Sequence, residues 1–160
     1  MTLKMKRNEK LAARFLSHSS SDTIEIARQL CSTLSANTVI ALHGDLGAGK
    51  TTFVKGIAKG LGALDMDSVS SPTFSYLNIY DGQIPLFHFD LYRMNTVSDF
   101  ILSGFEDYFH AGGICCIEWP CFAREVLPRD TVLIDFKHHG MLEREIFIRR
   151  IGESDEAIPV

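Results

Sequence analysis

The sequence has no apolar run approaching the length of a membrane-spanning helix, which needs about 20 predominantly apolar residues. Its first residues are basic, but they are not followed by the continuous apolar core of a secretory signal. We therefore expect no membrane contact and a cytoplasmic location.

A strong excess of either charge is also lacking. Sixteen Lys and Arg residues against 20 Asp and Glu residues leave a formal net charge of −4. A chain that binds nucleic acid alone usually carries a broad positive field, which this composition does not provide. Any contact with nucleic acid is therefore expected to be indirect.

Cysteine pairs with metal-binding spacing are absent, because none of the four cysteines forms a C-x-x-C motif. The favoured interpretation is buried, reduced thiols rather than a zinc site or a disulfide framework. The neighbouring His138 and His139 have no ligand cluster around them, so we interpret them as solvated.

One globular domain is expected for residues 1–160, since a content of 46% hydrophobic and 22% charged residues is ordinary. Residues 1–10 are basic and polar, which indicates a loose tail. Residues 153–160 are partly acidic, and we expect them to be frayed. No repeat or low-complexity segment divides the chain.

The most informative pattern is G-x-x-x-x-G-K-[ST], which residues 44–51 match as GDLGAGKT. It follows an apolar stretch at residues 39–42 and precedes a helical pattern at residues 52–61, as the motif requires. Glycines in such a loop let backbone N–H groups wrap a polyphosphate closely. The Lys50 ammonium would reach the terminal phosphates, and the Thr51 hydroxyl would be a ligand of Mg²⁺.

We therefore predict a nucleotide-binding loop that takes ATP with Mg²⁺. Its predicted binding residues are Asp45, Leu46, Gly47, Ala48, Gly49, Lys50, Thr51 and Thr52. Guanine nucleotides are disfavoured, because neither the N-K-x-D nor the D-x-x-G string of GTPases occurs in the chain.

Hydrophobic periodicity predicts an α/β fold of the P-loop NTPase kind, a mixed β-sheet flanked by helices and carrying antiparallel hairpins. Strands are expected at residues 14–16, 39–43, 74–80, 84–91, 114–118, 131–136 and 145–151. Helices are expected at residues 21–35, 52–61 and 96–109, the first of them capped by Ser21 or Asp22.

Two carboxylates end predicted strands, where ligands gather in open α/β sheets. Glu118 follows an apolar run that is typical of a central strand, so it is favoured as a holder of Mg²⁺. Asp90 ends an alternating strand in which His88, Asp90 and Tyr92 share one face. For Asp90, a site role and a surface pair with Arg93 are about equally favoured.

Four segments together resemble those of the bacterial TsaE proteins, also called YjeE: GDLGAGKTT at residues 44–52, SPTF at 71–74, HFDLYR at 88–93 and EWP at 118–120. The resemblance runs from about residue 21 to residue 152. It implies a P-loop ATPase needed to make threonylcarbamoyladenosine in tRNA. It also implies the TsaD and TsaB proteins as partners, with tRNA contacted through their complex, and slow hydrolysis that these partners stimulate.

The same resemblance implies roles for single residues. The expected catalytic residues are Lys50, Asp90 and Glu118, and the expected metal ligands are Thr51 and Glu118. Thr73 is expected in a nucleotide-sensing loop, although the residues alone favour a simple turn beside Pro72. Trp119 is interpreted as part of the nucleotide site and partner surface, or else as a core aromatic.

Two other functions stay open. A small-molecule kinase would use the same loop and acids, although no arginine-rich lid segment is apparent. A non-catalytic module would use ATP only to select a conformation.

Arg93 is the only arginine near a site motif. Four other basic residues belong to the last predicted hairpin: Lys137, Arg144, Arg149 and Arg150. We favour a solvated hairpin face for them over a surface that binds tRNA or an acidic partner.

Overall fold

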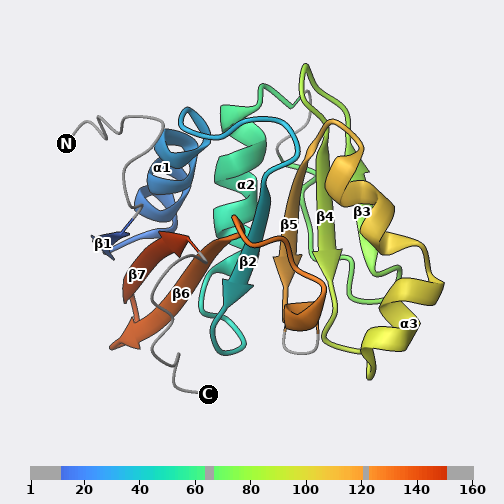
Figure 1. Cartoon of the computed structure of the whole chain (residues 1–160). Helices are drawn as coiled ribbons and strands as arrows, with labels where there is room; N and C mark the ends of the chain where they lie inside the picture. Colours follow the sequence, from blue (N-terminus) through green and yellow to red (C-terminus); the bar gives the residue numbers. More distant parts are fainter. Residues whose placement is uncertain (1–11, 64–66, 121–122, 151–160) are drawn as a thin grey trace.

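The computed structural model describes residues 12–63, 67–120 and 123–150. These residues form one mixed sheet of seven strands with helices on both faces (Figure 1). The elements in chain order are β1 (Ala12–Ser17), α1 (Ser20–Cys31), β2 (Val39–His43), α2 (Lys50–Gly60), β3 (Leu77–Tyr80), β4 (Leu86–Asp90), α3 (Val97–Leu102), the 3₁₀ helix η1 (Phe105–His110), β5 (Ile114–Glu118), the 3₁₀ helix η2 (Ala123–Glu125), β6 (Val132–His139) and β7 (Glu143–Arg150).

The middle of the sheet is parallel and its two flanks are antiparallel. The strand order is β1-β7-β6-β2-β5-β4-β3, with β2 parallel to β5 and β6, and β4 parallel to β5. The β3–β4 and β6–β7 pairs are antiparallel, and β1 lies antiparallel to β7 at one end of the order. The predicted α/β class, a mixed sheet with antiparallel hairpins, is confirmed.

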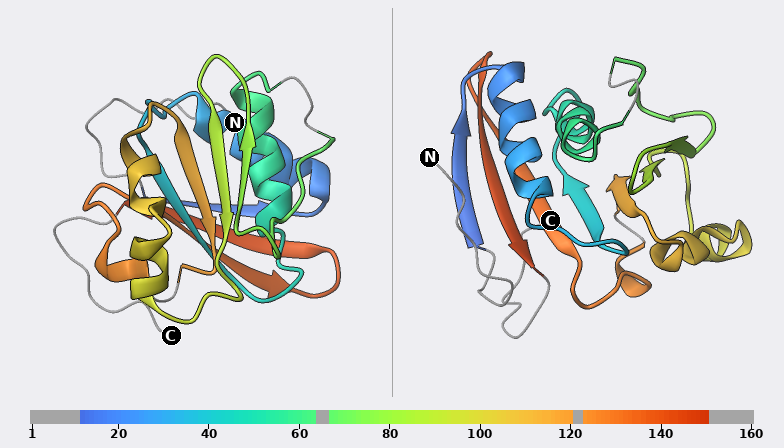
Figure 2. Two further views of the ribbon diagram at one scale, coloured as in Figure 1. Left: turned by 90° about the vertical axis from the view of Figure 1, so that its right-hand side faces the viewer. Right: turned by 90° about the horizontal axis from the view of Figure 1, so that it is seen from above.

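Alternation along the strands separates two hydrophobic cores. Helices α1 and α2 cover one face of the sheet, and α3 with η1 covers the other face beside β4 and β5 (Figure 2). In β4, Leu86 belongs to the core under α2, whereas Phe87 and Phe89 belong to the core under α3. The same alternation directs His88 and Asp90 to the α2 face, and the prediction that these two side chains share one face is confirmed.

The first helix begins and ends earlier than residues 21–35. Ser19 is its N-cap, because the Ser19 hydroxyl accepts a 3.0 Å hydrogen bond from the Asp22 N–H. The predicted cap, Ser21 or Asp22, is therefore wrong by two residues or more. Residues 19–21 are all serine, and hydrophobic periodicity alone does not tell which serine precedes the first turn.

The helix predicted at residues 96–109 is two short helices. Thr96 caps α3, with its hydroxyl accepting a 3.1 Å hydrogen bond from the Asp99 N–H. Gly104 then adopts a left-handed conformation with a φ of 71°, and the chain continues as η1. Glycine takes this conformation without a Cβ clash, so the break follows from the residue at that position.

The hairpin strands also differ from their predicted lengths. β3 begins at Leu77 rather than residue 74, because a 2.8 Å hydrogen bond from the Tyr76 N–H to the Pro72 carbonyl closes a turn before it. β6 continues as far as His139, so His138 and His139 belong to a strand, and both are exposed as predicted. Among the described residues, no cluster of three or more metal-ligating side chains occurs.

Burial keeps the described cysteines in their thiol form. It raises the pKa of Cys31 to about 11 and that of Cys115 to about 12, and both are free and buried as predicted. Cys121 and the predicted tails at residues 1–10 and 153–160 lie outside the described residues. Within residues 12–63, 67–120 and 123–150, no helix is long and apolar enough to cross a membrane.

Candidate functional site

Three neighbouring parallel strands end at the edge of the sheet where the predicted site residues gather. β2 leads into the glycine-rich loop, while β4 and β5 end at Asp90 and Glu118, which are register partners. Side chains at the carboxyl ends of parallel strands face a shared crevice. Both acids are buried, with 4% and 3% of their surface exposed.

The predicted phosphate loop, residues 44–49, takes backbone conformations that favour glycine at three positions. Gly44, Gly47 and Gly49 have φ values of 152°, 77° and 107°, which favour glycine. A Cβ on Gly44 would also lie only 2.9 Å from the Phe136 Cβ. Ala48 is packed in the core under α2 and fixes the loop to it.

Lys50 begins α2 and is buried, with 4% of its surface exposed. Its ammonium donates hydrogen bonds of 2.5 Å to the Gly44 carbonyl and 2.8 Å to the Asp45 carbonyl. The same nitrogen lies 4.0 Å from the centre of the Trp119 ring, a cation–π contact. The ammonium is thus held beside the loop at which it is predicted to bind the phosphates of a nucleotide.

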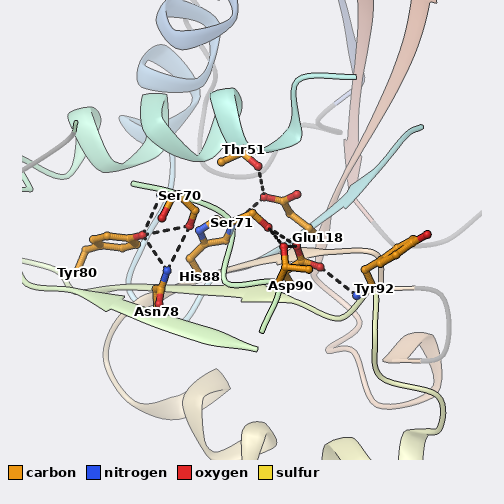
Figure 3. Close-up of polar contacts among 10 residues, drawn as sticks. Thr51, Ser70, Ser71, Asn78, Tyr80, His88, Asp90, Tyr92 and Glu118 are labelled. Atoms are coloured by element: carbon orange, nitrogen blue, oxygen red, sulfur yellow. Dashed lines mark hydrogen bonds and ion pairs between the residues drawn. The ribbon is translucent and has the colours of Figure 1, made fainter. Parts of the chain in front are cut away.

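A chain of polar contacts joins α2 to two strands (Figure 3). The Thr51 hydroxyl donates a 2.8 Å hydrogen bond to Glu118 Oε1, and His88 Nε2 lies 2.8 Å from the same oxygen. His88 is fully buried, and its other ring nitrogen, Nδ1, has no hydrogen-bond partner in the described part of the chain. Glu118 is therefore fixed from both sides.

Asp90 is held by the loop that precedes β3. The Ser71 hydroxyl donates to Asp90 Oδ2, the Thr73 hydroxyl lies 3.2 Å from the same oxygen, and the Tyr92 N–H donates to Oδ1 at 3.0 Å (Figure 3). The alternative surface pair with Arg93 is wrong, because the Arg93 guanidinium instead stacks over the exposed Phe74 ring at 4.4 Å.

Trp119 lines the same pocket as the two acids. Its φ of 57° is unusual for a bulky residue, and it places the indole against both Lys50 and the Tyr92 ring, 5.0 Å between ring centres for the latter. The interpretation of Trp119 as a core aromatic is therefore wrong, since its side chain is half-buried at the site.

These residues line one open pocket of about 460 Å³. Its lining is Ser20, Leu46, Gly47, Gly49, Lys50, Thr51, Thr52, Ser71, Thr73, Asp90, Tyr92, Glu118, Trp119 and Arg144. Two predicted binding residues in the loop do not line the pocket: the Asp45 side chain is exposed, and the Ala48 side chain is buried in the core. All the other predicted site residues are brought together.

Four lining residues were not predicted as site residues. Ser71 and Tyr92 lie inside the segments that resemble a known family, so their signal was present in the sequence. Ser20 and Arg144 come from α1 and β7, far from the phosphate loop in the chain. For Arg144 the predicted solvated face is wrong, since the side chain is half-buried at the pocket.

The donor set suits a metal-bound polyphosphate. The Thr51 hydroxyl and the Glu118 carboxylate are hard oxygen ligands of the type that Mg²⁺ prefers, and they adjoin a loop that presents N–H groups and a lysine.

His43, the last residue of β2, directly precedes this loop. Burial lowers the pKa of His43, while the charge of Asp135 opposes this shift and that of Arg124 adds to it.

Comparison with known proteins identifies similar chains. The family model described as "Threonylcarbamoyl adenosine biosynthesis protein TsaE" matches residues 17–146. The tRNA threonylcarbamoyladenosine biosynthesis protein TsaE of Bacillus subtilis (strain 168) is 41% identical over 138 residues, covering 86% of this chain and 85% of that protein. The protein of the same name from Treponema pallidum (strain Nichols) is 37% identical over 135 residues, covering 84% and 98%. A crystal structure of Bacillus subtilis YdiB matches with a TM-score of 0.72 and 35% identity, covering 91% of this chain and 89% of that one.

Proposed function

The chain belongs to the TsaE family, and from this premise we propose that it binds and hydrolyses Mg-ATP to support the formation of threonylcarbamoyladenosine in tRNA. One observation carries the nucleotide part of the proposal. The Thr51 hydroxyl contacts Glu118 beside a buried Lys50 on a glycine-rich loop, which is the arrangement that a metal-bound triphosphate requires.

The loop and α2 supply the binding contacts. Backbone N–H groups at the N-terminus of α2 bind phosphate oxygens, and the positive end of the helix dipole favours their charge. Lys50 exchanges the Gly44 and Asp45 carbonyls for the terminal phosphates. Thr51 and Glu118 would hold Mg²⁺, which when bound neutralises charge on the phosphate oxygens.

Asp90 is the residue that acts on the attacking water. Its carboxylate orients the water and takes its proton while the water oxygen attacks the γ-phosphorus, the bond to the ADP oxygen breaks, and ADP and phosphate leave. Ser71 and Thr73 hold the carboxylate in place. These two residues lie in a loop, so a contact that shifts the loop also shifts Asp90.

We propose the TsaB and TsaD proteins as the partners that make this contact, with tRNA bound through their complex. Large apolar side chains stand exposed at and beside the rim of the pocket: Leu46 and Tyr92, which line it, are 86% and 62% open to solvent, and Phe74, next in the chain to Thr73, is 80% open. An apolar rim of this kind is typical of a protein–protein contact. Partner binding would order the loop of Thr73 and raise a slow basal turnover.

Calorimetric titration of Lys50→Ala with Mg-ATP tests the nucleotide site. We expect weaker ATP binding and almost complete loss of turnover in a folded protein, because the variant keeps the backbone cradle but loses the cation. Lys59→Ala removes an exposed lysine from the same helix and should bind ATP like the wild type. Equal affinity and turnover in Lys50→Ala would overturn the nucleotide site.

Phosphate release measured with TsaB, TsaD and tRNA tests the family role. Turnover should rise when the partners are added, and depletion of the protein in cells should lower threonylcarbamoyladenosine in tRNA. Phosphate transfer to a small-molecule acceptor would indicate a kinase instead. Modification that proceeds with ATP bound but not hydrolysed would indicate a nucleotide-gated module.

A further inference from the structure

Arg144 occupies an inward position of β7. It pairs in register with Ser17 of β1 and His138 of β6, and it shares its face with Ile146 and Ile148, which are buried in the core under the helices. An arginine in the buried register of an alternating strand must have a reason other than packing, because the hydrophobic effect does not favour it there.

The Arg144 side chain lies against the phosphate loop. A Cβ built on Gly49 would lie 2.7 Å from Arg144 Nη1 and 3.4 Å from both its Cδ and its Cζ. Gly49 is the N-cap of α2 and directly precedes Lys50. The guanidinium therefore adjoins the backbone at the point where the loop becomes the helix, and it also lines the pocket.

This position is electrostatically unfavourable for a cation without an anion. The N-terminus of a helix carries partial positive charge, so a guanidinium beside Gly49, the N-cap of α2, is repelled there. Arg144 Nε is buried and has no hydrogen-bond partner among the described residues. A buried donor without an acceptor is costly, which indicates that a ligand supplies the acceptor.

The acids nearest to Arg144 in sequence do not neutralise it. Glu143 Oε1 lies 3.0 Å from His18 Nδ1. Glu145 points to the opposite face of the sheet, where it forms an ion pair with Arg14 and lies 3.0 Å from His139 Nε2. In the described part of the chain, Arg144 has no carboxylate partner, whereas both flanking acids are engaged elsewhere.

We propose that Arg144 binds the phosphates of the nucleotide as a second cation beside Lys50. The proposal rests on the proposed function, because it takes a nucleoside polyphosphate as the ligand of the pocket. A guanidinium fork can donate two parallel hydrogen bonds to a phosphate, which an ammonium cannot. In the sequence Arg93 is the only arginine near a site motif, whereas the fold brings Arg144 to the pocket from the last strand.

Calorimetric titrations with Mg-ATP and Mg-ADP test this role in the full chain. We expect Arg144→Gln to lose at least about tenfold in ATP affinity, the effect of one charge-assisted hydrogen bond. Arg144→Lys should fall between Arg144→Gln and the wild type, since it keeps the charge but not the fork. Arg150→Gln removes an exposed arginine from the same strand and should bind like the wild type.

Thermal unfolding gives a second readout that does not depend on turnover. Without nucleotide, Arg144→Gln should melt no lower than the wild type, because the variant removes a repelled charge from the helix N-terminus. At an ATP concentration that saturates the wild type, the variant should gain less stability, because stabilisation by a ligand grows with the logarithm of the ratio of its concentration to its Kd.

The outcomes separate this inference from the proposed function. If the wild type does not bind ATP, the nucleotide site and the role of Arg144 both fail. If the wild type binds ATP and Arg144→Gln matches Arg150→Gln, only the role of Arg144 fails. Should Arg144→Gln not fold, Arg144→Lys with wild-type affinity for both nucleotides would overturn the fork contact.

Discussion

Thr51 Oγ1 donates a 2.8 Å hydrogen bond to Glu118 Oε1, which ties the first turn of α2 to the end of β5. The two oxygens are of the types that Mg²⁺ prefers, and they belong to elements fixed by the sheet and by the core rather than by a free loop. The metal ligands that we propose are therefore in place before any ligand arrives.

Replacing each acid should produce a different defect. Glu118→Gln should weaken Mg²⁺-dependent ATP binding, because the amide is a poorer metal ligand than the carboxylate. Asp90→Asn should bind Mg-ATP almost normally but hydrolyse it poorly, because the amide does not accept the proton. Metal titrations and single-turnover rates measure the two effects. Glu125→Gln, at an exposed position, is the control, and the opposite pattern would exchange the two roles.

Removing the hydroxyls that hold Asp90 should lower turnover without lowering nucleotide affinity. Ser71→Ala and Thr73→Ala each delete one contact to Asp90 Oδ2, so we expect a loss of about tenfold in turnover for each. Thr73→Ser keeps a hydroxyl and should retain most of the activity. Steady-state kinetics measure the effect, and wild-type turnover in the double alanine variant would contradict it.

His88→Phe should destabilise the fold. The substitution leaves the buried Glu118 carboxylate with fewer hydrogen-bond partners, at a cost of about 1–3 kcal/mol in the free energy of unfolding. His88→Gln keeps a donor of similar length and should recover part of the loss. Urea unfolding measures both values, and a Phe variant as stable as the wild type would show that His88 does not support Glu118.

His43 should make the fold less stable in weak acid. Burial lowers the pKa of His43 in the folded chain, so the unfolded chain binds more protons at this site. The contribution is fully present above the ordinary histidine pKa of about 6.5 and is lost as the pH falls from there through the lowered pKa of the folded chain. His43→Gln should therefore flatten the fall in Tm between about pH 7 and pH 5. Parallel curves for the two proteins would contradict this.

The features that could be predicted from the sequence are those determined by residues close together in the chain. The order of the seven strands, the position of the glycine-rich loop between β2 and α2, and the two acids at strand ends all follow from local periodicity and spacing, and the structure has them as predicted. The break at Gly104 also had a local signal, because a glycine inside a helical pattern can end a helix. Hydrophobic periodicity alone does not register this effect.

The features that the sequence did not predict depend on contacts between residues that are far apart in the chain. Arg144 and Gly49 are separated by most of the chain, and they meet only because β7 joins the sheet beside β1 and β6. Likewise, Asp90 differs from a surface acid only through the loop of Ser71 and Thr73 folding onto it. Neither contact can be predicted from a single sequence, since both arise from tertiary packing.

Trp119 provides an intrinsic fluorescence signal at this site. It is the only tryptophan in the sequence, and its indole lies against the Lys50 ammonium and the Tyr92 ring. Tryptophan emission depends on nearby charge and on solvent, so a ligand that draws Lys50 away from the indole changes the fluorescence of the whole protein. If the pocket binds a nucleotide as proposed, the binding can be followed in the unlabelled, unmodified chain.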